Sequence, residues 1–294
     1  MMTRIASTLY ATAIYGFIFL PVAVLVLFSF QGTLFPIPPF NGPSLRWYQA
    51  VLGDARLTAG LGNSVLVAVT TSAVATLLGF LSAWGLARFH LPASALLRGF
   101  ITLPLTVSYL IIGMGLLIFF NWIGLPKSLI AAGIGHVVIN LPLCFAIAYS
   151  QMGEHQANIE RAARDLGARE WQVLALITAP MLWPALFAGF FLSMTFSWDE
   201  FVIAFLLTRF DTTLPVEIWN LLRAGLNPKT NAVGSLVFGV SIVLAIVFGP
   251  LRERMAITTG LARLPRLGHL LNVGWTLVLV LIGWVFFRAA NISD

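Results

Sequence analysis

The sequence predicts an all-α fold: a polytopic membrane helical bundle with six core transmembrane helices and a seventh, C-terminal hydrophobic segment. Three observations predict this class. Of the 294 residues, 59% are hydrophobic and only 10% are charged, whereas about a quarter of the residues in a soluble domain are charged. The mean hydropathy is +0.92. The apolar residues gather in runs of about twenty, the length that a helix needs to cross a bilayer.

Several function classes are excluded by composition. The 17 lysines and arginines give a net charge of +6, but they are scattered singly between apolar runs, so no nucleic-acid partner is expected. Cys144 is the one cysteine, which excludes a disulfide and a cysteine-based metal site within the chain. No metal or cofactor is predicted. The chain has no phosphate-binding loop motif, so it is not expected to be an enzyme with its own ATPase site.

The spans can be placed in order along the chain. The runs cover about residues 9–30, 61–87, 99–120, 128–150, 181–207 and 232–250, and the seventh covers 270–287. The Pro- and Gly-rich stretch after the first run cannot be a continuous helix, and Trp47 and Tyr48 in it are expected as interface anchors. Small and hydroxyl residues in the second run, including Gly79, predict close helix packing. Pro104 predicts a kink in the third run.

Polar residues inside the runs are costly in lipid and are expected to face protein or a wet path. His136 and Asn140 are in the fourth run, and Asp199 and Glu200 are in the fifth. Asp199 lies about 27 Å along a helix from the start of its run, in the outer third of the membrane. The acidic pair therefore lies either at an outer cavity or at the interface, making structural contacts. Trp198 beside it either stacks on a cation or anchors the interface.

The orientation follows from the basic residues. The segments expected inside hold ten lysines and arginines, against seven outside, which favours a cytoplasmic N-terminus. Residues 158–180 follow an even number of spans, so they are expected in the cytoplasm.

Residues 158–180 are a charged segment that reads as helix, glycine turn and helix, closed near Pro180. Gly167 stands where a helix end needs positive φ. The helical period puts Ile159, Ala162, Ala163 and Leu166 on one face, available for a partner, and Glu160, Arg161, Arg164 and Asp165 on the other, where Glu160 and Arg164 form an i,i+4 pair. A solvated surface loop is the alternative that this pattern leaves open.

The same segment carries a family resemblance. The run from Arg161 to Ala168 (Arg-Ala-Ala-Arg-Asp-Leu-Gly-Ala), followed by Ile177 and Pro180, resembles the signature loop of ABC importer permeases. The stretch 198–246 resembles the polyamine branch, the spermidine/putrescine permease subunits. The resemblance covers residues 1–260. It implies a type I ABC importer permease domain with its coupling loop at 151–180, in a bacterial inner membrane.

The resemblance also implies partners and sites. The expected partners are ABC ATPase subunits, a second permease subunit in a heterodimer, an external solute-binding protein, the lipid bilayer and a small cationic solute, namely a polyamine. The residues implied for ATPase coupling are Glu160, Arg161, Ala162, Ala163, Asp165, Gly167, Ala168 and Pro180. Those implied for the substrate path are Trp198, Asp199 and Glu200.

Two departures from the family pattern stand out. The family's glutamate lies six residues before the glycine, where this chain has Arg161, and Glu160 is one position earlier. One residue rotates a side chain by about 100° around the helix, so Glu160 need not replace that contact. An altered ATPase partner or a tolerant contact would each explain this.

The second departure is an extension at 261–294. Its end, Gly-Trp-Val-Phe-Phe-Arg-Ala-Ala-Asn-Ile-Ser, resembles a segment of alginate-type membrane-bound O-acyltransferases. We interpret the extension as a fused or incidental seventh span. The alternatives to a permease are a membrane-embedded enzyme such as an acyltransferase, for which His136 is the one histidine within a span, and an ion-coupled carrier, for which repeated halves would be expected.

Truncation after Arg266 is expected to leave transport largely intact, because the seventh run lies outside the predicted six-helix core. Solute uptake by membranes that hold equal amounts of the full-length and truncated chains measures this. Complete loss of assembly would show that the seventh run is structural.

Overall fold

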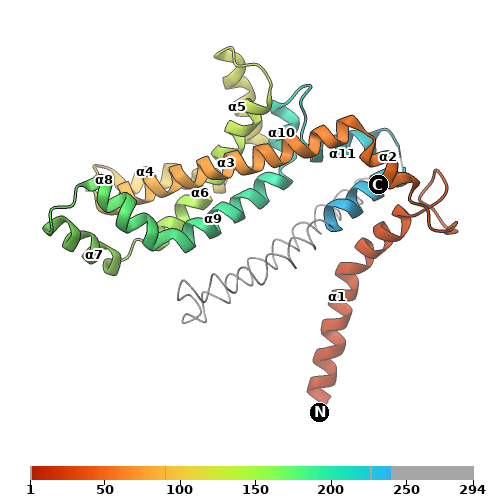
Figure 1. The fold of residues 1–294 in the computed structure, drawn as a ribbon, viewed down its shortest axis with the longest axis horizontal. Coiled ribbons are helices and arrows are strands. Elements are labelled where there is room, and N and C mark those ends of the chain that lie inside the picture. The colour runs from red at the N-terminus through yellow and green to blue at the C-terminus, as the bar shows by residue number, and fades with distance from the viewer. Residues whose placement is uncertain (1, 90, 226, 240–294) are drawn as a thin grey trace. The chain divides into compact units, whose positions relative to one another are not determined.

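The computed structural model describes residues 2–89, 91–225 and 227–239, and these residues confirm the all-α prediction (Figure 1). Their only β pairing is an isolated bridge between Gln31 and Pro43. The chain forms two compact units. One consists of Met1–Thr58 with Glu217–Asp294, and the other of Ala59–Val216.

Thirteen helical elements are bounded within the described residues. The first unit contains α1 (Met2–Ser29), α2 (Arg46–Leu52), the start of α3 and most of α11 (Leu214–Arg223). The second contains the rest of α3 (Ala55–Arg88), α4 (Ser94–Thr102), the 3₁₀ helix η1 (Leu103–Leu105), α5 (Tyr109–Trp122), α6 (Leu129–Ser150), α7 (Glu154–Asp165), α8 (Glu170–Gln172), the π-helix η2 (Val173–Thr178), α9 (Ala179–Asp199) and α10 (Val202–Leu207).

Four helices in the described part of the chain are long and apolar enough to cross a membrane. They are Thr12–Ser29, Ala55–Arg88, Leu129–Ser150 and Glu170–Asp199. The bent pair Ser94–Leu105 and Tyr109–Trp122 gives a fifth if it counts as one span. Residues 228–239, at the start of the predicted sixth span, are helical. The rest of that span and the predicted seventh segment lie outside the described residues.

In the first unit, the Pro-rich linker folds back on the end of α1. The indole Nε1 of Trp47 donates to the Gln31 carbonyl at 2.7 Å, and the Tyr48 and Ser29 hydroxyls are 2.6 Å apart. Trp47 is only 5% exposed. Its expected role as an interface anchor is therefore wrong in this unit, because the ring is buried and its N–H is taken by a carbonyl two residues beyond the end of α1.

In the second unit, α6 packs against α4, α5, α9 and α10. An apolar cluster joins α5, α6 and α10; it consists of Phe120, Ala131, Ala132, Ile139, Ile203 and Leu207. α3 crosses α6 closely, since a Cβ on Gly79 would lie 2.7 Å from the backbone nitrogen of Phe145. The expectation that small residues on this span allow close packing is confirmed at this crossing.

The third span is interrupted rather than gently kinked. Pro104 lies in η1, and the helix axis turns by 104° between Ser94–Leu105 and Tyr109–Trp122. The predicted irregularity at Pro104 is confirmed. The break is larger than a proline kink because a 3₁₀ turn and an extended residue, Ser108, separate the two helices.

The fifth span differs from its prediction at both ends. The helix does not close near Pro180, because Glu170–Asp199 runs on as one span through the π-helix η2, whose widened turn accommodates a proline just after it. The run also does not reach Leu207 as one helix. Glu200 is extended, and its Oε1 accepts the Ile203 N–H at 2.9 Å, so the carboxylate takes the place of a helical carbonyl and α10 begins anew.

Gly79→Ala is expected to destabilise the second unit by about 1–3 kcal/mol, because the added methyl meets the α6 backbone. Gly85→Ala is the matched control on the same helix, where nothing lies within 4 Å of a new Cβ, and it should match or exceed wild-type stability by up to about 1 kcal/mol. Tryptophan-fluorescence thermal unfolding in detergent compares the variants. Equal melting temperatures for both would contradict the close crossing.

Candidate functional site

The end of α7 is a glycine turn of the predicted kind. Gly167 has φ of +90°, and its N–H donates to the Arg164 carbonyl at 2.9 Å. The Ala168 N–H donates to the Ala163 carbonyl at 3.0 Å. This pair of bonds is the Schellman arrangement, which needs a residue that tolerates positive φ. It reverses the chain tightly and leads it into α8.

The outer face of α7 is exposed and partly apolar. Leu166 is 90% exposed, and Ala162 and Gly167 are also exposed. Ile159 and Ala163, predicted on the same face, are half-buried. We call the exposed set Arg161, Ala162, Asp165, Leu166 and Gly167 the outer α7 face. Leu166 on it is almost uncovered by the described residues.

Glu160 lies on the charged face of α7 that the helical period predicts, but it is shielded from solvent. It is fully buried. Arg88 donates through Nε to its Oε2 at 2.6 Å and through Nη2 to its Oε1 at 3.3 Å. The Thr178 hydroxyl donates to Oε1 at 2.9 Å. The predicted i,i+4 ion pair is also present, with Arg164 Nη2 3.9 Å from Oε2. We call Arg88, Glu160 and Thr178 the Glu160 clamp.

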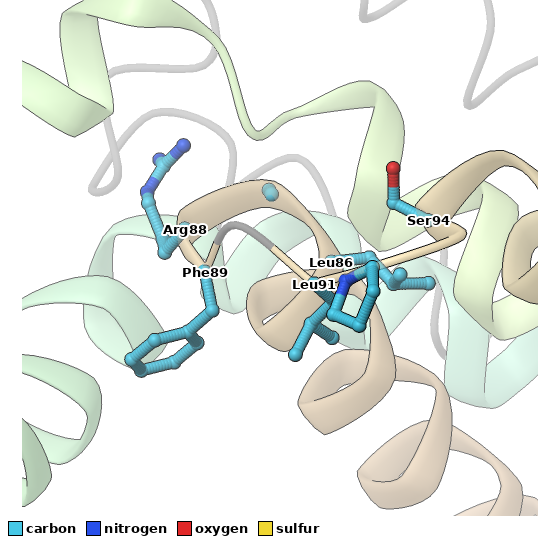
Figure 2. A pocket seen from close by; sticks show the side chains of 7 residues that line it. Leu86, Arg88, Phe89, Leu91 and Ser94 are labelled. Carbon is cyan, nitrogen blue, oxygen red and sulfur yellow. The ribbon is translucent and has the colours of Figure 1, made fainter.

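Arg88 is the last residue of α3 and carries a second contact. Its Nη1 donates to the Met152 carbonyl, just beyond the end of α6, at 3.3 Å. Figure 2 shows the Arg88 and Phe89 side chains leaving the end of α3 in different directions. They border an open hollow of about 450 Å³, lined by Leu86, Ala87, Arg88, Phe89, Leu91, Pro92 and Ser94. The α3–α4 turn and α7 thus lie at the same end of the second unit (Figure 1).

Arg161 points outward at the position of the family's glutamate. Its guanidinium donates to the Ala157 carbonyl and to the Asn158 side chain on its own helix. Arg164 pairs more closely with Glu170, at 2.7 and 3.0 Å, than with Glu160. That hydrogen-bonded carboxylate raises the pKa of Arg164 above its ordinary value. The outer α7 face therefore presents the Arg161 guanidinium together with the Asp165 side chain.

The acidic pair lies at the other end of α9. Trp198 and Asp199 are half-buried, and Glu200 is 7% exposed. Twenty-one residues of helix separate Thr178 from Asp199, which is about 30 Å. The predicted coupling residues from Glu160 to Ala168 thus lie on α7 and the turn that ends it, and Pro180 lies in the first turn of α9. The structure does not bring the acidic pair to them.

A polar seam runs between α3, α6 and α9. His136 Nδ1 lies 2.7 Å from the Ser197 hydroxyl, which is 3.0 Å from that of Thr71. His136 and Asn140 are 0% and 2% exposed, which confirms that they face protein. Further along, the Cys144 thiol reaches the Gly189 carbonyl at 3.7 Å. Polar or small residues repeat every four positions along both helices, and this repeat is a sequence signal for the seam that inspection of single spans misses. They are His136, Asn140 and Cys144 on α6 and Gly189, Ser193 and Ser197 on α9.

Arg88 and Thr178 are functional candidates that sequence reasoning missed. Arg88 reads as one more basic residue at the inner end of a span, and Thr178 as one polar residue in an apolar run. Their link to Glu160 spans 72 and 18 positions, which no local period reports.

Known proteins resemble this chain over most of its length. Residues 75–256 match the family model described as binding-protein-dependent transport system inner membrane component. The putrescine transport system permease protein PotI of Escherichia coli K12 is 32% identical over 241 residues, which cover 79% of this chain and 85% of PotI. The spermidine/putrescine transport system permease protein PotC of the same organism is 28% identical over 247 residues, covering 84% and 93%.

A solved structure shares the fold. A bacterial ABC transporter involved in the import of the acidic polysaccharide alginate superposes with a TM-score of 0.62. The match covers 86% of this chain and 96% of that one, at 18% identity. The helical importer-permease fold expected from the sequence is confirmed by this likeness.

Proposed function

The chain belongs to the family of binding-protein-dependent transport system inner membrane components, and we propose that it forms part of the translocation path for a small cationic solute, a polyamine. As an ABC importer permease it is a transport subunit, with ATP hydrolysis supplied by other subunits. A polyamine is proposed as the solute because the chain is 28–32% identical to two polyamine permeases, along most of its own length and most of theirs. The assembly would include ATPase subunits, a second, different permease subunit and an external solute-binding protein.

The outer α7 face is the proposed contact with the ATPase. An apolar side chain that is 90% exposed at Leu166 gains free energy when a partner covers it. The Schellman turn holds this side chain at the tip of α7. With the cytoplasmic N-terminus that the basic residues favour, α7 lies in the cytoplasm, where an ATPase would meet it.

Asp199 is the better candidate of the acidic pair for the solute. A carboxylate in a partly desolvated cavity attracts an ammonium group strongly, and Trp198 beside it offers a ring face to a cation. Glu200 has a structural partner, the Ile203 N–H. The alternative of structural contacts therefore has direct support at Glu200. The enzyme alternative gains nothing from His136, which is fully buried against Ser197.

Leu166→Asp is expected to weaken ATPase binding about thirtyfold, since losing an interface anchor costs about 2 kcal/mol or more. Gly167→Trp should act in the same direction by adding bulk to the outer α7 face. Co-purification of the ATPase with the tagged permease measures both. The control is Leu52→Asp, the same change at a leucine that is 68% exposed in the first unit. Full ATPase recovery with Leu166→Asp would rule out docking through this face.

Asp199→Asn is expected to lower polyamine uptake about tenfold at subsaturating solute, through loss of one charge-assisted contact. Glu200→Gln removes the negative charge but keeps an oxygen that can accept the Ile203 N–H at the start of α10. It therefore tests the charge without removing the helix cap. The double variant should lose uptake without losing membrane abundance. Radiolabelled putrescine uptake, normalised by immunoblot, measures these effects. Unchanged uptake kinetics in the double variant would reject the cation site.

A further inference from the structure

We propose that the Glu160 clamp is a positioning device that makes α7 move as one body with the ends of α3, α6 and α9. The proposal rests on α7 being the ATPase contact, and it assigns Arg88 and Thr178 a role in coupling. Neither residue belongs to the outer α7 face.

The clamp connects four segments through one carboxylate. Glu160 on α7 is bound by Arg88 at the end of α3 and by Thr178 at the end of η2. Arg88 in turn binds the Met152 carbonyl beyond α6. Covalently, α7 is joined to its neighbours only by short turns at Gly153 and Gly167. Without the clamp, α7 could pivot on these turns.

Burial makes the clamp stiff. The Glu160 and Arg88 side chains are 0% and 9% exposed, so pulling them apart would leave each buried charge without its closest opposite charge and with little access to water. The Arg164–Glu170 pair on the same segment is different. Its side chains are 28% and 51% exposed, so water can replace either partner when the pair opens. α7 is therefore tied firmly on its inner side and loosely on its outer side.

The clamp also grips the base of α9. Thr178 is the last residue of η2, and α9 starts at the next residue. A π-helical turn inside a longer helix is frequent at functional sites. A displacement of α7 would reach the first turn of α9 through the Glu160–Thr178 bond, and α9 continues for about 30 Å, with Pro184 inside it, to Asp199.

The test uses the complete importer in proteoliposomes, with its ATPases, second permease and binding protein, and putrescine as the probe. Glu160→Gln is expected to retain the ATPase, because the outer α7 face is unchanged. Putrescine carried per ATP hydrolysed should fall on the order of tenfold. The matched control is Glu170→Gln, which weakens the exposed Arg164–Glu170 pair. This variant should carry as much putrescine per ATP hydrolysed as the wild type.

Two further variants separate coupling from folding. Arg88→Glu combined with Glu160→Arg restores opposite charges and should recover part of the ratio that each single change loses. Thr178→Val removes one hydrogen bond at nearly constant volume and should lower the ratio less than Glu160→Gln does. If Glu160→Gln does not accumulate in the membrane, Thr178→Val decides the question.

A second measurement does not depend on the solute. Spin labels on Leu166→Cys and Leu91→Cys report the distance between the α7 tip and the α3–α4 turn, and Cys144 is 3% exposed, so it stays unlabelled. A narrow distance distribution in the otherwise unaltered chain should broaden with Glu160→Gln. The clamp proposal would be overturned if the spin-label distance distribution did not change with Glu160→Gln. It would also be overturned if the variant that decides the question carried as much putrescine per ATP as the wild type, or if every clamp variant lost the ATPase. ATPase retained by Leu166→Asp, or no putrescine uptake by the wild type, would instead overturn the proposed docking or solute.

Discussion

A carboxylate that water cannot reach must have its charge and its oxygens satisfied by the protein. Glu160 imposes this constraint on its end of the second unit. Arg88 has to arrive with its guanidinium edge towards the carboxylate, so α3 must end at that level. The hydroxyl of Thr178 has to reach Oε1, so the chain must turn back within a few residues between α7 and α8 for η2 to lie against α7. The Schellman turn at Gly167 makes that return possible.

The packing of the spans and the position of α7 are therefore linked. α3 lies against the α6 backbone at Gly79, nine residues or about 14 Å before Arg88. Hydroxyls at Thr71 and Ser197 tie α3 to α9 further along. Small residues allow the helices to approach, and the polar seam fixes their register. Together they deliver Arg88 to Glu160, while Leu166 at the end of α7 stays exposed.

Much of this fold follows from the sequence. Apolar runs predict the long helices, Gly167 predicts the left-handed turn and Pro104 predicts a break, because each of these depends on a single residue or a local run. The burial of Glu160 does not follow from the sequence, because a helical period describes one helix alone and does not show what packs against it. Arg88, which decides where Glu160 lies, is 72 positions away.

The same limit explains the acidic pair. Glu200 reads as part of a continuous apolar run, and nothing local shows that its carboxylate accepts the Ile203 N–H and ends α9. The site residues on α7 were identified by resemblance to a family motif, whereas their geometry comes from tertiary contacts. Residues that act through another residue, such as Thr178, leave no motif to recognise.

The break before α5 has a consequence for the surroundings of the protein. After the Thr106 N–H, which donates to the Leu103 carbonyl, the ladder of main-chain hydrogen bonds stops, and it resumes where the Ile111 and Ile112 N–H groups donate to the Ser108 carbonyl. Acyl chains can neither donate nor accept a hydrogen bond, so irregular backbone at membrane depth persists only against protein or water. Thr106 and Ser108 are exposed in the isolated chain. Whether the bent pair crosses the bilayer or re-enters on the same side, the boundary with lipid cannot run across this turn.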